Sequence, residues 1–226
     1  MIQAIVTDIE GTTSSLSFVK DVLFPYSRER LAEFIQQRGQ HPEVKQLLEE
    51  ARQVAGKSLD DAQLITQLMR WIDEDKKITP LKSLQGMIWE EGYRRGHFIS
   101  HLYEDAARNL RRWKQQGLKL YVFSSGSVQA QELLFAHTEF GDLAPLFSDY
   151  FDTRIGAKRE VTAYHAIATS IGIEPQHILF LSDIKEELDA ARRTGMRTVW
   201  LCREGVMPSS RDHMAVGSFD AIDVSR

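Results

Sequence analysis

Two acids, Asp8 and Glu10, stand two positions apart where the short apolar run IQAIVT ends. A charged side chain is costly at the end of a buried strand unless it meets a partner there. Carboxylates can attack phosphorus as nucleophiles, move protons, or bind a hard cation through oxygen. The pair therefore marks the end of the first predicted strand as a place for chemistry.

Further polar residues follow three later apolar runs. Ser124 and Ser125 come with Gly126 after LKLYVF, Lys158 comes after DYFDTRIG, and Asp183 comes after HILFLS. In a doubly wound parallel sheet, ligands bind outside the carboxyl ends of the strands. We therefore expect all these side chains to converge with Asp8 and Glu10 on a single crevice.

The elements that must position these residues alternate between strand and helix. Apolar strand patterns occur at 2–9, 118–126, 149–156, 177–183 and 197–203, and helical spacing of apolar residues separates them. Gly117, Gly172 and Gly195 are placed to end the intervening helices. This alternation predicts an α/β fold with a doubly wound, mostly parallel sheet and helices on both faces.

Residues 20–103 show a different pattern, in which no strand is evident. Apolar residues recur at helical spacing within 44–54 and 64–72, and Thr79 as N-cap with Pro80 after it predicts a third helix. The sequence thus predicts an all-helical domain, residues 19–104, inserted into a Rossmann-like catalytic core made of residues 1–18 and 105–226.

Composition narrows the class of protein. The 226 residues carry a formal net charge of −4, which argues against a nucleic-acid or anionic-membrane binder. A single cysteine, Cys202, excludes an internal disulfide framework and a cysteine zinc cage, and it fits a reducing cytoplasm. The N-terminal residues do not resemble a signal peptide, and no apolar stretch approaches 18 residues, so we expect no membrane span.

The four strand-end motifs, in this chain order, resemble those of the haloacid dehalogenase superfamily of phosphotransferases. Longer stretches are similar to one of its families, the enolase-phosphatases of methionine salvage: DIEGTTSSLSFVKDVLFPY (8–26), YVFSSGSVQAQELLFAHTEFGDL (121–143), YFDTRIGAKRE (150–160) and ILFLSDIKEELDAA (178–191). The resemblance runs from residue 2 to about 203, and the inserted helices fit that family's cap domain.

The resemblance implies a bifunctional, Mg²⁺-dependent phosphomonoesterase with one ion per subunit, acting as a monomer in the cytoplasm. Such an enzyme enolises 2,3-diketo-5-methylthiopentyl-1-phosphate and then dephosphorylates the enol, through an aspartyl-phosphate, to the acireductone 1,2-dihydroxy-3-keto-5-methylthiopentene. The implied metal ligands are Asp8, Glu10 and Asp183. The implied substrate-binding residues are Ser124, Ser125 and Lys158, and the implied catalytic residues are Asp8, Glu10 and Lys158.

The roles have a physical basis. An Asp8 carboxylate repels a phosphate dianion, so a cation must sit between them, and Lys158 would neutralise both. Glu10 would act as general acid and then as general base, while Glu187, one turn beyond Asp183, could orient a water bound to Mg²⁺.

The sequence does not identify the residue that acts as the base for enolisation. Glu10 stands where most phosphatases of the superfamily have aspartate, and its extra reach of about 1.5 Å could serve proton transfer at carbon as well as at oxygen. Lys20, Tyr26, Arg28 and His97 are alternatives that the sequence does not rank.

Other functions remain to be weighed against this one. The chain could be another capped phosphatase of the same superfamily, acting on a small sugar or glycolate phosphate. It could also be a signalling receiver domain that is phosphorylated on aspartate, although receivers are about half this length and pair their acids adjacently. A catalytically dead binding module is a third possibility, but no motif position is missing.

Overall fold

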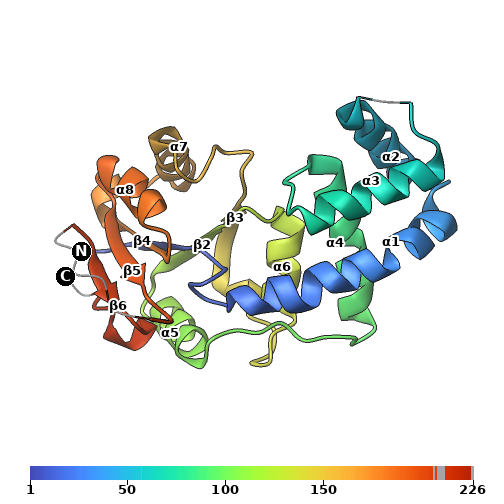
Figure 1. The fold of residues 1–226 in the computed structure, drawn as a ribbon. Coiled ribbons are helices and arrows are strands. Elements are labelled where there is room, and N and C mark those ends of the chain that lie inside the picture. Colours follow the sequence, from blue (N-terminus) through green and yellow to red (C-terminus); the bar gives the residue numbers. More distant parts are fainter. Residues whose placement is uncertain (57, 206, 208–211, 225–226) are drawn as a thin grey trace. The chain divides into compact units, whose positions relative to one another are not determined.

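The computed structural model describes residues 1–56, 58–205, 207 and 212–224. Within them the chain divides into two compact units, one formed by Met1–Leu16 with Ser100–Arg226 and the other by Ser17–Ile99. The first unit holds every strand named below, and the second is helical (Figure 1). Each unit has its own hydrophobic core.

The strand-bearing unit is built on a six-stranded sheet in which every neighbouring pair is parallel, in the order β3-β2-β1-β4-β5-β6. Its strands are β1 (Ala4–Thr7), β2 (Lys119–Phe123), β3 (Phe147–Phe151), β4 (Ile178–Ser182), β5 (Arg197–Leu201) and β6 (Met214–Val216). The five strands predicted from the sequence are confirmed, and so is the doubly wound α/β fold. The short strand β6 was not predicted.

Helices cover both faces of this sheet. They are α5 (Glu104–Gln115), α6 (Val128–Ala136), α7 (Val161–Ile171) and α8 (Lys185–Arg193), with 3₁₀ turns at Ala144–Leu146, Pro175–His177 and Phe219–Ala221. Figure 1 shows α7 and α8 on one face and α5 on the other. Ala4 and Val6 of β1 belong to the core cluster that contains α7 and α8, which fits the alternation of side chains along a strand.

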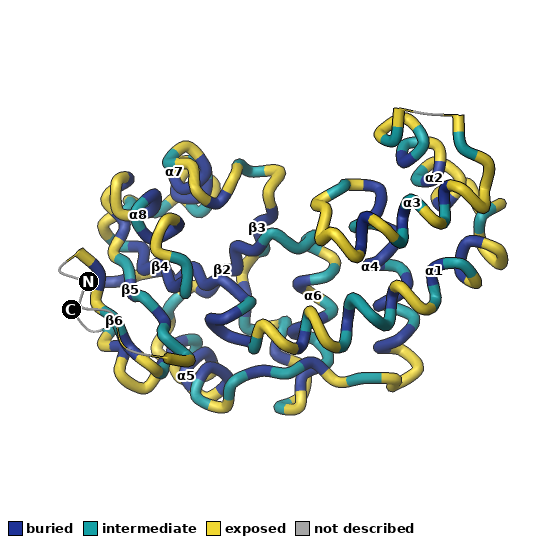
Figure 2. The backbone as a smooth tube through the Cα atoms, viewed as in Figure 1, coloured by how far each residue is buried: buried dark blue, intermediate teal, exposed yellow. Residues whose placement is uncertain are grey.

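Strand β1 lies in the interior of the sheet, between β2 and β4. All four of its residues are buried, as Figure 2 shows for the central strands in dark blue. The chain leaves β1 toward β2 on one side and returns from β3 to β4 on the other, so the strand order reverses there. Such a reversal opens a crevice at the carboxyl ends of the strands.

The helical unit contains α1 (Phe24–Arg38), α2 (Pro42–Ala55), α3 (Asp61–Asp73) and α4 (Thr79–Arg94), preceded by a π-helical segment, Phe18–Leu23. Helices α2 and α3 match the two predicted amphipathic patterns. The sequence reading missed α1, whose buried residues include the polar Ser27 beside Leu31 and Phe34. Ser27 is accommodated because it donates to the Phe24 carbonyl and accepts from Gln85.

The predicted start of α4 was wrong by one residue. Ile78 occupies the N-cap, and Thr79 and Pro80 fill the first two helical positions. Pro80 has no N–H to leave unsatisfied there, so the helix tolerates an apolar cap. None of the helices in the described part of the chain is long and apolar enough to cross a membrane.

Candidate active site

Asp8 is the first residue after β1 and is almost completely buried. Its backbone N–H donates to the Leu181 carbonyl of β4 at 2.9 Å, so the main chain at Asp8 still belongs to the sheet. This anchoring fixes the direction of the carboxylate at the carboxyl edge of the sheet. The strand end thus supplies a rigidly held acid, as the sequence predicted.

The chain turns sharply directly after Asp8. The N–H groups of Thr12, Thr13 and Ser14 all point to the Ile9 carbonyl, and the Thr13 hydroxyl donates to the Asp8 carbonyl at 3.2 Å. Gly11 takes a φ of +73°, a conformation that favours glycine. We call residues 8–14 the first-strand loop.

The first-strand loop lies against the residue that ends β4. A Cβ atom placed on Gly11 would overlap the Asp183 carboxylate, so the two loops touch at this point. The backbone carbonyl of Asp183 accepts a hydrogen bond from Trp200 Nε1 at 2.9 Å. Gly11, three residues beyond Asp8, thus packs against Asp183, and the convergence of Asp8 and Asp183 stays a prediction.

Lys158 lies between two carboxylates in the buried part of this site. Its Nζ is 2.6 Å from Asp8 Oδ1 and 2.8 Å from Glu187 Oε2. The contact with Asp8 is a close ion pair. Burial alone would lower the pKa of Lys158, but the charges of Asp8 and Glu187 outweigh it and raise that pKa, so the side chain remains an ammonium.

Glu187 lies in the first turn of α8 and is buried beside Lys158. Its Oε2 accepts from Ser182 Oγ at 2.9 Å as well as pairing with Lys158. The carboxylate is thus a second acidic partner of the ammonium, besides Asp8. Its predicted role in orienting a water bound to the metal stays a prediction.

Ser124 and Glu10 meet beside the first-strand loop. The buried Ser124 hydroxyl donates to Glu10 Oε2 at 3.2 Å and accepts from the Gly126 N–H at 3.1 Å. Ser125 is half-buried. The N-cap of α6 is Ser127, whose Oγ accepts from Ala130, so the two predicted substrate serines are not used as helix caps.

Acids outnumber the ammonium in this site. Burial raises the pKa of Asp8 well above its ordinary value, and the charges of Glu187 and Glu10 add to the rise while Lys158 opposes it. Burial likewise raises the pKa of Asp183 to about 6. If these carboxyls are all ionised, their charge exceeds that of the Lys158 ammonium, and a further cation would balance it.

The donor chemistry of the site fits a hard dication. Asp183 Oδ1 is buried and has no hydrogen-bond partner, whereas the buried Asp8 Oδ1 is paired with Lys158 Nζ at 2.6 Å. Among the described residues, no group of three or more His, Cys, Asp or Glu side chains forms a metal cluster. The three predicted ligands, Asp8, Glu10 and Asp183, therefore do not form such a cluster in this structure. Mg²⁺ usually keeps several waters and binds through one or two carboxylates together with phosphate oxygens.

Sequence reasoning missed two residues at the end of β5. Trp200 holds the Asp183 carbonyl, and Arg203 holds the Thr12 carbonyl of the first-strand loop. Both follow the strand-end rule that located the other site residues. Neither carries a chemistry that marks it in the sequence, because each acts through a backbone carbonyl.

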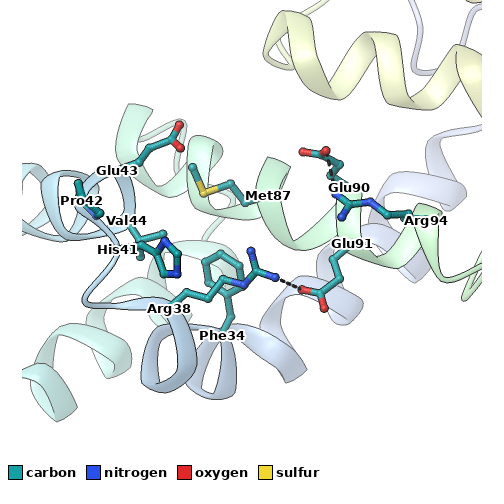
Figure 3. A pocket seen from close by; sticks show the side chains of 10 residues that line it. All are labelled: Phe34, Arg38, His41, Pro42, Glu43, Val44, Met87, Glu90, Glu91 and Arg94. Carbon is teal, nitrogen blue, oxygen red and sulfur yellow. Dashed lines mark hydrogen bonds and ion pairs between the residues drawn. The ribbon is translucent and has the colours of Figure 1, made fainter.

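A separate pocket of about 450 Å³ lies within the helical unit (Figure 3). It is lined by residues of α1, α2 and α4 together with the connection between α1 and α2, and Arg38 and Glu91 form an ion pair across it at 3.9 Å. None of the predicted catalytic, substrate-binding or metal residues lines it. The candidate site is therefore the crevice at the strand ends.

Comparison with known proteins shows which family the chain belongs to. The profile of the family described as "Hydrolase: haloacid dehalogenase-like hydrolase" matches residues 2–195. The enolase-phosphatase E1 of Methylococcus capsulatus is 60% identical over 223 residues, covering 98% of each chain. The chain belongs to the enolase-phosphatase E1 family.

Other enolase-phosphatases E1 are similar over the same length. That of Thioalkalivibrio sulfidiphilus is 59% identical and covers 96% of this chain and 100% of its own. Among solved structures, the UTR4 protein of Saccharomyces cerevisiae superposes with a TM-score of 0.84 at 30% identity, covering 98% of this chain and 100% of its own. The similarity to enolase-phosphatases E1 thus extends beyond the residues that the broader haloacid dehalogenase-like profile matches.

Proposed function

We propose that the site performs the two reactions of an enolase-phosphatase of methionine salvage. The substrate would be 2,3-diketo-5-methylthiopentyl-1-phosphate, which is enolised and then dephosphorylated to the acireductone. The observation that carries the proposal is the buried Asp8 carboxylate at the end of β1, 2.6 Å from Lys158 and in a loop that touches Asp183. The family membership of the whole chain supports the same conclusion.

Asp8 would be the nucleophile of the phosphatase reaction. Its carboxylate oxygen attacks phosphorus, the bond from phosphorus to the substrate oxygen breaks, and an aspartyl-phosphate forms. Water then cleaves that acyl-phosphate and regenerates the carboxylate. Lys158 supports both steps, because its ammonium offsets the charge of the nucleophile and of the phosphoryl oxygens.

Glu10 would move the protons of these steps. As general acid it protonates the leaving enol oxygen, and as general base it takes a proton from the attacking water. Ser124 donates to its Oε2 and so orients the carboxylate. We also propose Glu10 as the base for enolisation, and Ser124 and Ser125 as groups that bind phosphate oxygens.

Mg²⁺ is the proposed cofactor, one ion per subunit, with Asp8, Glu10 and Asp183 as its ligands. When bound, it would neutralise the repulsion between Asp8 and the phosphate and polarise the oxygens that it contacts. The buried Asp183 carboxylate oxygen that has no hydrogen-bond partner supports this proposal.

Several further features belong to the proposal. Residues 19–104 would act as the cap, supplied by the helical unit Ser17–Ile99, and would exclude water during phosphoryl transfer. The proposed state is a monomer in the cytoplasm, a reducing compartment that suits the free Cys202.

The test is to incubate the protein with the diketo phosphate and Mg²⁺ while following enol absorbance and free phosphate separately. We expect both signals, with many phosphates released per chain, and loss of phosphate release when EDTA removes the metal. Rapid hydrolysis of sugar or glycolate phosphates with no enol signal would instead identify another capped phosphatase. A single phosphate retained per chain would indicate a phosphorylated switch.

A further inference from the structure

Arg203 lies just beyond β5, and its side chain is only 7% exposed. The guanidinium grips the first-strand loop at one atom: Nε and Nη2 donate to the Thr12 carbonyl oxygen at 2.9 and 2.7 Å. Two donors of one planar group on a single carbonyl fix that oxygen in distance and in direction.

The other edge of the same guanidinium is held by Asp105, the second residue of α5. Nη1 lies 2.7 Å from Asp105 Oδ2. The same carboxylate oxygen accepts from the Phe219 N–H at 2.7 Å and from Ser218 Oγ at 3.0 Å. Arg203 therefore links three segments: the first-strand loop, the start of α5 and the segment after β6.

Aromatic rings complete this setting. The guanidinium carbon lies 4.1 Å from the centroid of the Tyr103 ring and 5.1 Å from that of Phe219. The backbone N–H of Tyr103 donates to the Thr13 carbonyl, the next one along the loop, at 2.9 Å. Two consecutive carbonyls of the first-strand loop are thus held from outside the sheet.

This grip acts next to the contact that brings the two acidic loops together. Thr12 directly follows Gly11, whose Cα faces the Asp183 carboxylate. A shift of the Thr12 carbonyl would move Gly11 and change the spacing between Asp8 and Asp183. That spacing decides whether both carboxylates can reach one ion.

A buried guanidinium is a costly way to hold a loop for stability alone, since apolar residues of similar volume often serve that purpose as well. Arg203, and Ser218 and Phe219, which donate to Asp105, also lie beyond residues 2–195, the part matched by the haloacid dehalogenase-like profile. The superfamily motifs therefore do not account for this network.

We propose that Arg203 is a positioning residue, which holds the first-strand loop so that Asp8 and Asp183 share one divalent cation. This inference rests on the proposed function, because it assumes that both acids bind that cation. It assigns to the segment after β5 a part in the site that none of the four strand-end motifs supplies.

The test uses Arg203→Lys, which keeps the charge but cannot hold the carbonyl and Asp105 with one planar fork. Binding of Mn²⁺ alone is measured by electron paramagnetic resonance on the full chain, and Mg²⁺ midpoint, kcat and KM are measured separately. We expect the Mn²⁺ dissociation constant and the Mg²⁺ midpoint to rise about tenfold or more. KM for the substrate at saturating Mg²⁺ should change less than about threefold, because the residue touches no substrate.

The matched control is Arg108→Lys. Arg108 also joins α5 to the segment after β6, through Asp220 at 2.6 Å, and its other ion-pair partner, Glu104, lies at the start of α5 rather than in the first-strand loop. It should bind Mn²⁺ like the wild type. Equal Mn²⁺ affinity in Arg203→Lys and Arg108→Lys would overturn the proposal.

Two further variants separate a failure of this proposal from a failure of the proposed function or of folding. Asp183→Asn should abolish Mn²⁺ binding, and a wild type that binds no Mn²⁺ would count against the proposed function itself. If Arg203→Lys does not fold, as judged by circular dichroism, Asp105→Asn replaces it, because Arg203 keeps Thr12 there but loses its ion-pair partner. Asp105→Asn should weaken Mn²⁺ binding about threefold, and wild-type affinity in that variant would contradict the proposal.

Discussion

The two units handle charge in opposite ways. In the helical unit, Arg28 and Asp73 form a two-pronged ion pair at 2.6 and 3.0 Å, yet both side chains are about half exposed, at 47% and 50%. In the strand-bearing unit, Lys158 pairs with Asp8 and Glu187 at similar distances, and all three side chains are under 10% exposed. The distances within the pairs are therefore similar, but the exposure of their side chains to water differs.

Exposure changes what such a pair does. An exposed pair gains little from attraction, because water solvates each charge almost as well, and salt screens what remains. A buried cluster loses the hydration of each charge, and the loss is offset only by close partners. Charges kept in the strand-end crevice therefore indicate chemistry, whereas those on the helical unit indicate a solvated surface.

Of the variants that test this contrast between the two units, the one that removes the proposed nucleophile should have the largest effect. Asp8→Asn should lower steady-state phosphate release by at least about 10³-fold, because an amide does not form the acyl-phosphate. The fold should survive, since burial already favours the neutral form of this carboxyl. Phosphate release and circular dichroism check the two parts.

The control for this variant is Asp149→Asn, on the exposed face of β3. It should keep wild-type turnover. Near-normal turnover in Asp8→Asn would remove Asp8 as nucleophile.

A finer test shortens Glu10 by one methylene. In Glu10→Asp the carboxylate withdraws from Ser124 and from the reacting carbon, so enolisation should fall about 10²-fold. Hydrolysis of p-nitrophenyl phosphate should fall about tenfold or less, because its leaving group needs little protonation. Equal losses in both assays would refute the shared role of Glu10. The surface variant Glu186→Asp measures the effect of the same substitution away from the site.

The pH dependence of stability sharpens the contrast between the units. The folded-state pKa of Asp183, about 6, lies above its ordinary value of 3.8, so folding favours the neutral carboxyl. The stabilisation that this brings to the metal-free protein is complete below about pH 4 and is lost as pH rises through 6. Asp183→Asn should therefore unfold at a higher temperature than the wild type at pH 7.5 without metal.

That advantage of Asp183→Asn should shrink as pH falls through 6, and added Mg²⁺ should stabilise only the wild type. Thermal unfolding scans of both proteins from pH 5 to 8, with and without Mg²⁺, check this. A difference that stays constant with pH would show that the carboxyl has an ordinary pKa.

The smallest effect is expected on the helical unit. Arg28→Met removes the exposed pair with Asp73, and the unfolding midpoint should stay within about 2 °C of wild type. Asp73→Asn should behave alike, since the same pair is lost. A large loss of stability in either variant would contradict the view that exposed pairs contribute little.

Much of the site followed from the sequence because of one geometric rule. The carboxyl ends of parallel strands share one edge of the sheet, so Asp8, Ser124 and Asp183 could be grouped from their places after apolar runs. Lys158 required more, since it stands seven positions beyond the end of β3. The roles assigned to these residues rest on the resemblance to a family.

What escaped prediction depends on contacts that leave no pattern. Arg203 donates to a backbone carbonyl far away in the chain, and Trp200 donates to the Asp183 carbonyl. The sequence does not show which carbonyl a donor side chain will reach, so such contacts could not be predicted. Strand β6 has only three residues, too few for a period to emerge. Helix α1 hides its pattern because the buried face includes Ser27.

The central place of β1 also has a consequence for how the protein is made. This strand is synthesised long before both its neighbours, with β2 starting at Lys119 and β4 at Ile178. A parallel sheet closed over such long loops forms slowly, because distant segments must meet before any pairing is gained. The nascent chain must therefore keep β1, whose residues are all buried in the folded protein, unpaired until β2 has been made, so this strand is a segment that chaperones would protect.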